Sequence, residues 1–160
     1  MERAVAVICI HATAVSIDGR AALLRGPPGS GKSDLALRCL AQPSTPLTNG
    51  PAILVADDQV RIWPDAEGRL IVAPPETIRG KIEVRGLGII EIPFASTSRL
   101  ALVVDLAAHG EKIDRMPEPD HVTILENRVP RLILSPFEAS APLKLLLALT
   151  RTDTTSVHHE

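Results

Sequence analysis

One stretch near the start of the chain has the residue types and spacing of a phosphate-binding loop. Residues 26–33, "GPPGSGKS", fit the pattern G-x-x-x-x-G-K-[ST], in which glycines let successive backbone N–H groups turn toward phosphate oxygens. Lys32 is placed to bind the β- and γ-phosphates of a nucleotide, and the Ser33 hydroxyl to bind Mg²⁺. The residues that we expect to contact the nucleotide are Gly26, Pro27, Pro28, Gly29, Ser30, Gly31, Lys32, Ser33 and Asp34.

A phosphate-transferring site of this kind also needs a carboxylate near the metal, usually at the end of a neighbouring strand. Two apolar runs end in acid: "ILVADD" in Asp57 and Asp58, and "LALVVD" in Asp105. Periodicity does not choose between them, and a solvated acidic turn or a structural carboxylate gives the same patterns. Because side chains alternate along a strand, Asp57 and Asp58 cannot share one face. We expect one to face the nucleotide while the other braces a loop or touches the metal.

A second glycine-containing stretch, "KIEVRGLGIIEI" at residues 81–92, has polar residues at alternate positions. Glu83 and Arg85 point the same way on a strand that Gly86 and Gly88 then interrupt. A carboxylate and a guanidinium on one face suit a site that handles metal and phosphate. A cross-strand ion pair would give the same pattern, so this stretch alone does not decide.

The pattern of elements indicates a mixed sheet. Asp18-Gly19 lies between the apolar runs 11–17 and 20–25, which predicts a hairpin that feeds the phosphate loop with an antiparallel strand. We expect a helix over 32–41 and a final helix over 141–151. Further strands are predicted at 4–10, 52–56, 59–63, 69–73, 81–92, 99–107 and 122–134. Residues 1–151 are predicted to form one phosphate-loop domain, and 152–160 a polar, disordered tail.

Composition limits the class of protein. The 160 residues allow one compact domain, and with 45% apolar but only 2% aromatic residues the core must be aliphatic. A net charge of −2 and few aromatic rings argue against nucleic-acid binding. Cys9 and Cys39 lack metal-site spacing and are expected to be buried and unpaired. No apolar stretch approaches the ~18 residues of a membrane span, so we expect a cytoplasmic protein.

Three segments in this order, "GPPGSGKSDLAL", "LVADDQV" and "IEVRGLGIIEI", resemble the catalytic domain of HPr kinase/phosphorylase over residues 5–150. That bacterial family acts on a serine of the phosphocarrier protein HPr. The preceding "IHATAVSIDGRAALLRG" is similar to the family's His-led hairpin. The resemblance implies an α/β phosphate-loop fold like that of phosphoenolpyruvate carboxykinase, with a mixed β-sheet, antiparallel hairpins and flanking helices.

The resemblance also implies roles for individual residues, with ATP and Mg²⁺ as cofactors and HPr as the protein partner. Lys32 would bind phosphate, while Ser33 and Glu83 would hold Mg²⁺. Asp58 matches the family's proton acceptor, and Asp57 is its close companion. The resemblance implies two further catalytic residues: His11, near the transferred phosphate, and Arg115, in "EKIDRMP". The sequence surroundings alone indicate only a structural histidine and a solvated arginine.

The sequence departs from the family pattern in two places. Ten residues precede His11, so we expect a short form, similar to those of alphaproteobacteria, without the separate N-terminal domain. The family's arginine-containing segment before the last helix is replaced by "LILSPFEASAP", which makes phosphorolysis doubtful. A small-molecule kinase and a non-enzymatic nucleotide-binding module remain as alternatives, and homo-oligomers are possible.

Overall fold

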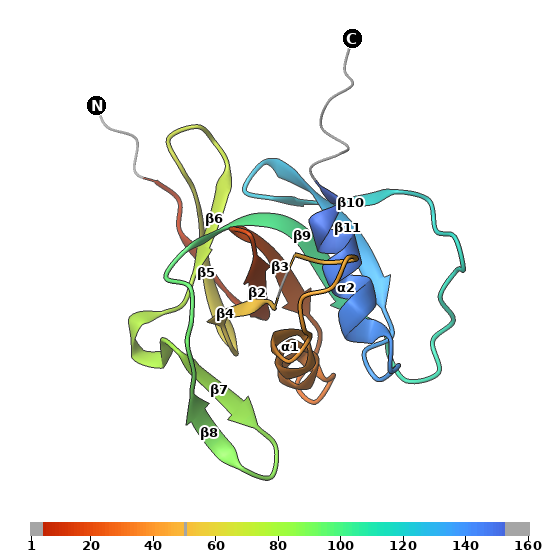
Figure 1. The fold of residues 1–160 in the computed structure, drawn as a ribbon. Coiled ribbons are helices and arrows are strands. Elements are labelled where there is room, and N and C mark those ends of the chain that lie inside the picture. Colours follow the sequence, from red (N-terminus) through yellow and green to blue (C-terminus); the bar gives the residue numbers. More distant parts are fainter. Residues whose placement is uncertain (1–4, 50, 153–160) are drawn as a thin grey trace.

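The fold is centred on one large mixed sheet, seen in a computed structural model that describes residues 5–49 and 51–152. The strands follow the order β1-β5-β6-β9-β3-β2-β4, and β11 pairs with β9 and with β10 (Figure 1). The strand bounds are β1 Ile8–His11, β2 Thr13–Ile17, β3 Arg20–Arg25, β4 Ile53–Ala56, β5 Gln59–Pro64, β6 Leu70–Ala73, β9 Ser98–Leu106, β10 Asp120–Ile124 and β11 Asn127–Leu134.

The centre of this sheet is parallel and its surroundings are antiparallel. β9 runs parallel to β3 on one side and parallel to β11 over its last residues, whereas β2 pairs antiparallel with β3 and with β4. β5 pairs antiparallel with β1 and with β6. The predicted mixed sheet with antiparallel hairpins is therefore confirmed.

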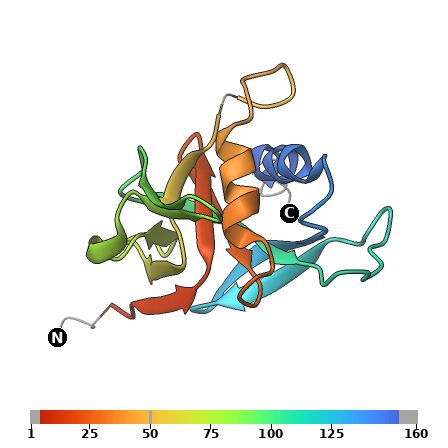
Figure 2. The same ribbon diagram turned by 90° about the horizontal axis from the view of Figure 1, so that it is seen from below.

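Two helices cover one face of the sheet, α1 Lys32–Leu40 and α2 Ala141–Thr150. They lie side by side against β2 and β3 (Figure 2). Both predicted helices are confirmed to within one residue, and Pro142 occupies the first turn of α2, where its missing N–H does no harm. Among the described residues, neither helix is long and apolar enough to cross a membrane.

The core is aliphatic and lies on both faces of the central strands. In β3, Ala22 and Leu24 face the helices while Ala21 and Leu23 face a second buried cluster under the opposite side of the sheet. Side chains of a strand alternate between faces, and all four of these are fully buried. This explains why the sequence of β3 is continuously apolar rather than alternating.

The hairpin that feeds the phosphate loop has the predicted turn. Asp18 and Gly19 both adopt positive φ, 51° and 74°, as the tight hairpin turns that match strand twist require. A second turn of this kind joins β10 to β11 through Leu125 and Glu126, with φ of 45° and 67°. Neither central position of that turn is a glycine or an asparagine, so the sequence predicted only a single apolar run there.

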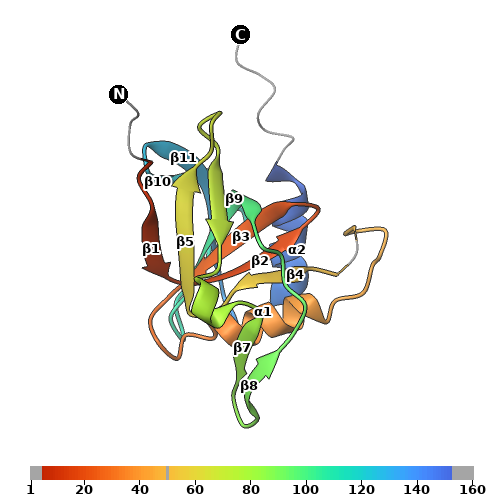
Figure 3. The ribbon, with the colours of Figure 1, turned by 90° about the vertical axis from the view of Figure 1, so that its left-hand side faces the viewer.

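A separate two-stranded sheet, β7 Lys81–Val84 and β8 Gly88–Glu91, extends from the main body (Figure 3). It is preceded by the short 3₁₀ helix η1 Glu76–Ile78, and β7 contacts α1.

Two sequence predictions are wrong in detail. Residues 5–7 are not part of a strand, and Cys9 is exposed rather than buried, although both cysteines are free. The predicted tail lies outside the described residues except for residue 152.

Candidate active site at the phosphate loop

The phosphate loop connects β3 to α1. β3 ends at Arg25, and α1 begins at Lys32 after Gly31, which has a φ of 99°. An alanine at Gly26 would place its Cβ 2.5 Å from the Ser30 hydroxyl, which is far inside van der Waals contact. Gly29 also has a positive φ, of 79°, so the glycines of the motif meet a backbone path that other residues would strain.

The first backbone N–H groups of α1 lie at the end of the phosphate loop. Within the described residues, no side chain caps the N-terminus of α1, and the first intrahelical bond runs from the amide of Leu35 to the carbonyl of Gly31. The earlier amides of the helix therefore remain available, and they lie at the positive end of the helix dipole. Such an end is a binding site for phosphate.

Lys32 is folded back onto the loop. Its Nζ donates hydrogen bonds to the carbonyl oxygens of Gly26, at 2.6 Å, and Pro27, at 3.0 Å. Burial lowers the pKa of Lys32 below its usual value, and the negative charges of Asp58 and Asp57 oppose this shift. The ammonium thus sits beneath the loop with two carboxylates nearby.

Asp57 is a buried hydrogen-bond acceptor that joins three elements. Its Oδ1 accepts bonds from the hydroxyls of Thr13, at 2.9 Å, and Ser33, at 2.6 Å. Its Oδ2 accepts a bond from the backbone N–H of Glu83 at 3.0 Å. The carboxylate at the end of β4 thereby ties the start of β2, the first turn of α1 and β7 together. Of the two neighbouring aspartates, Asp57 is therefore the one that braces the surrounding segments.

Asp58 has the opposite environment. Its side chain is 67% exposed, its φ is 69°, and its carboxylate lies 3.2 Å from Nδ1 of His11. The two residues meet because β1 and β5 are paired with His11 opposite Gln59. The backbone carbonyl of Asp58 also accepts a hydrogen bond from the amide of Ala12. A left-handed backbone conformation, tolerated by aspartate, directs this carboxylate away from the buried position of its neighbour.

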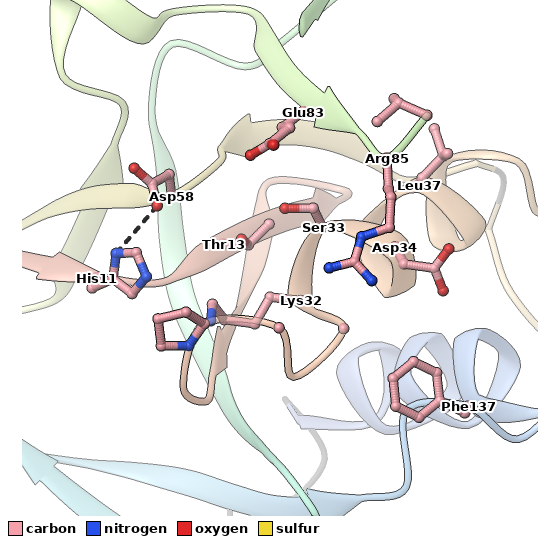
Figure 4. A pocket seen from close by; sticks show the side chains of 14 residues that line it. His11, Thr13, Lys32, Ser33, Asp34, Leu37, Asp58, Glu83, Arg85 and Phe137 are labelled. Carbon is pink, nitrogen blue, oxygen red and sulfur yellow. Dashed lines mark ion pairs between the residues drawn. The ribbon is translucent and has the colours of Figure 1, made fainter. Parts of the chain in front are cut away.

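These groups surround one cleft of about 530 Å³, which falls in the range of ~300–1,000 Å³ that ligand pockets occupy. Figure 4 shows Lys32 and Ser33 at its centre, with His11 and Asp58 on one side and Phe137 on the other. The lining residues are His11, Thr13, Pro28, Gly29, Gly31, Lys32, Ser33, Asp34, Leu37, Asp58, Glu83, Val84, Arg85 and Phe137.

Not every predicted site residue lines this cleft. Arg115 lies on the exposed segment between β9 and β10, outside the cleft. The other predicted residues that are not in the lining are Gly26, Pro27, Ser30 and Asp57, although Asp57 contacts Ser33. Thr13 and Phe137 also line the cleft and were not predicted from the sequence. Thr13 is a polar residue at the start of an apolar strand, which gave a weak indication, whereas Phe137 carried none.

Asp105, the other acidic strand end, has a structural role. Its carboxylate accepts hydrogen bonds from Arg25, at 2.8 Å, and from Arg131, at 2.5 Å. Burial acts to raise the pKa of Asp105, but these hydrogen bonds and the two positive charges outweigh it and hold the pKa below its usual value. Asp105 thus joins the ends of β3, β9 and β11 and does not line the cleft.

The oxygen atoms around Ser33 match the preferences of Mg²⁺. The Ser33 hydroxyl and the Asp57 carboxylate are in contact, and Glu83 lines the same cleft. Within residues 5–49 and 51–152, no three His, Cys, Asp or Glu side chains converge on one point. Mg²⁺ is commonly held by one or two carboxylates together with substrate phosphates and water rather than by a full protein cage, so this donor set fits that ion.

The fold and this site together define a phosphate-loop protein built on a mixed sheet, with the carboxylate of Asp58 and the imidazole of His11 on the same cleft as Lys32 and Ser33. Residues 3–148 match the family model of the HPr Serine kinase C-terminal domain. The chain belongs to this family, as the sequence comparison of its three motifs predicted.

Individual relatives agree with this assignment. The chain is 34% identical to the HPr kinase/phosphorylase of Caldicellulosiruptor bescii over 78% of its own length and 40% of that protein. It is 33% identical to the HPr kinase/phosphorylase of Geobacillus kaustophilus, over 78% of this chain and 41% of the relative. The chain therefore spans about two fifths of the length of these curated relatives.

The fold is also found in a solved structure. The Hpr(Ser) kinase/phosphatase from Coxiella burnetii superposes on this chain with a TM-score of 0.73 and 24% sequence identity, covering 92% of this chain and 96% of that one. This likeness confirms the predicted fold.

Proposed function

We propose that this chain is an ATP-dependent kinase that transfers a phosphate to a serine of the phosphocarrier protein HPr. The observation that carries the proposal is that the Asp58–His11 pair lies on the same cleft as Lys32 and Ser33. A carboxylate facing a phosphate-binding lysine is what a proton acceptor for an attacking hydroxyl requires. Family membership and the names of the relatives supply HPr as the acceptor.

Binding of the nucleotide rests on the loop and on Lys32. The amides at the start of α1 bind phosphate oxygens, and Lys32 exchanges its bonds to the Gly26 and Pro27 carbonyls for phosphate contacts. Because phosphoryl transfer asks for little covalent chemistry from the protein, positioning and charge neutralisation account for most of the rate.

The serine hydroxyl gives its proton to Asp58, and His11 keeps that carboxylate oriented. Asp57 holds the Ser33 hydroxyl and the β7 backbone in place. Ser33 and Glu83 would hold Mg²⁺ with the nearby Asp57 carboxylate, and the ion, when bound, neutralises charge on the phosphates.

The reverse reaction, phosphorolysis of phosphoserine-HPr, is expected to be slow. The segment between β11 and α2, residues 135–140, contains Phe137 but no arginine. In the family pattern, this segment before the last helix contains an arginine, and the resemblance links that segment to phosphorolysis. Incubation of phosphoserine-HPr with phosphate should therefore give little pyrophosphate, and rapid pyrophosphate formation would contradict this.

The proposal is tested by incubating the chain with Mg²⁺, γ-labelled ATP and HPr, and by identifying the labelled residue by mass spectrometry. We expect label on an HPr serine and none on an HPr variant in which that serine is alanine. Asp58→Asn should retain ATP binding but lose about 100- to 10,000-fold in transfer rate, the range of general-base contributions. Transfer to a small molecule in place of HPr, or full activity of Asp58→Asn, would contradict the proposal.

A further inference from the structure

The cleft continues past the phosphate loop to an aromatic ring that the proposed chemistry does not use. Phe137 lies on the opposite side of Lys32 from His11 and Asp58, near Asp34 and Leu37 (Figure 4). Its side chain is 62% exposed. The chain contains two Phe, one Trp and no Tyr, and Phe137 is the one of these that lines the cleft. Because ligand pockets are commonly lined by aromatic side chains, a ring exposed to this cleft is a candidate contact for a ligand.

The backbone on both sides of Phe137 is held by one guanidinium. Arg38 of α1 donates a hydrogen bond to the carbonyl of Pro136 and another, of 3.3 Å, to the carbonyl of Glu138. Its Nε contacts Asp34 one turn earlier on the same helix, at 3.1 Å. Arg38 does not itself line the cleft. The helix that begins at the phosphate loop therefore also fixes the position of the ring.

The ring lies directly against the loop. A Cβ added to Gly31 would meet two ring atoms of Phe137 at 3.1 Å, so the ring is in contact with the N-cap of α1. One part of the ring faces this glycine, and the exposed remainder faces the cleft. The aromatic surface is thus placed next to the amides at the start of α1 and is largely exposed.

The direction of the bound nucleotide follows from the chemistry at the other end. If the terminal phosphate lies at Asp58 and His11, the remainder of the molecule must extend along the loop in the opposite direction. That direction leads to Leu37 and Phe137 (Figure 4). The cleft of about 530 Å³ extends over both ends, and a triphosphate alone would leave the aromatic end empty.

We propose that the ring of Phe137 is the platform on which the nucleobase of the bound nucleotide stacks, with Leu37 as an adjoining apolar contact. Arg38 acts as a positioning residue that holds the ring through the carbonyls of Pro136 and Glu138. This inference rests on the proposed nucleotide-dependent function, and it assigns the part of the site that reads the base.

The test compares two Mg²⁺-bound ligands that differ in whether they carry a base: ATP and inorganic tripolyphosphate. Phe137→Ala should weaken ATP binding by about 5- to 150-fold, the range for stacking of a base on one aromatic side chain, and leave tripolyphosphate binding unchanged. Phe137→Tyr should keep both affinities, whereas Phe137→Leu should lose ATP affinity. Because the ring is largely exposed, thermal denaturation should show that Phe137→Ala folds as the parent does.

Arg38→Lys provides an independent variant, because an ammonium cannot hold both carbonyls in the same geometry. It should weaken binding of ATP but not of tripolyphosphate, although Arg38 lies outside the cleft. Lys32→Ala is the matched control and should weaken both ligands.

Each other outcome overturns the inference in a distinguishable way. If the parent chain binds neither ligand, the proposed function itself is wrong. If the parent binds both and Phe137→Ala binds ATP as tightly as the parent does, the function stands and the base platform is refuted. Equal weakening of both ligands would mean that the ring only supports the loop. Unchanged ATP affinity with a raised KM for HPr would assign the ring to protein docking instead.

Discussion

The two neighbouring carboxylates at the end of β4 should respond very differently to substitution. Asp57 accepts three hydrogen bonds, of 2.9, 2.6 and 3.0 Å, and is 5% exposed. Asp57→Ala leaves the fully buried Thr13 hydroxyl and the Glu83 amide without this acceptor. Hydrogen bonds to charged groups contribute about 1.5–3 kcal/mol each, and the carboxylate's own desolvation offsets part of their sum. We expect the free energy of unfolding to fall by roughly 3–5 kcal/mol.

Asp58 is the matched control at the adjacent position. Its contact with His11 is solvent-exposed on both sides, and such pairs contribute at most about 1 kcal/mol. Asparagine also tolerates the positive φ of this position, so Asp58→Asn should unfold within about 1 kcal/mol of the parent chain. The two variants therefore separate a structural carboxylate from the proposed catalytic one.

The measurement is urea denaturation of the parent and both variants near neutral pH without nucleotide, followed by circular dichroism. In a separate thermal melt, the expected loss in Asp57→Ala should appear as a fall in Tm of roughly 6–20 °C for a chain of this size. An Asp57→Ala variant within about 1 kcal/mol of the parent would refute the view that Asp57 braces the site. Equal losses in both variants would refute the asymmetry between the two aspartates.

Three further predictions concern other parts of the chain. Because hydrogen bonding holds the pKa of Asp105 below its ordinary 3.8, its stabilisation is present above that pH and is lost as pH falls through the folded-state pKa. Asp105→Asn should thus be less stable than the parent at pH 7, and urea titrations should show the difference shrinking below about pH 4; a constant difference would contradict the pairing. Gly31→Ala should impair folding and ATP binding more than Gly29→Ala, since both have positive φ but only the former meets a side chain; calorimetry of both variants checks this. Arg115→Ala should leave ATP affinity unchanged and slow transfer to HPr at least about tenfold, and an unchanged turnover would remove this arginine from the proposal.

Local sequence patterns predicted the elements that carry the site. The phosphate loop, the helix after it and the Asp18-Gly19 hairpin are each specified by adjacent residues, whose backbone preferences act over a few positions. The apolar runs 20–25 and 99–107 likewise predicted strands, and the structure shows that β3 and β9 are buried on both faces. The turn at Leu125 and Glu126 was missed because neither residue favours positive φ.

The sequence by itself determined the phosphate-loop pattern at residues 26–33, and it predicted which acidic residues could serve a nucleotide there. Only the tertiary structure decided the roles of those acids, because hydrogen bonds between residues 24 to 80 positions apart assign Asp57 to Ser33 and Thr13 and assign Asp105 to Arg25. The place of Phe137 depends on a hydrogen bond from Arg38 to the carbonyl of Pro136, which lies 98 positions further along the chain. Burial and charge pairing arise when distant segments meet, and no local preference encodes them.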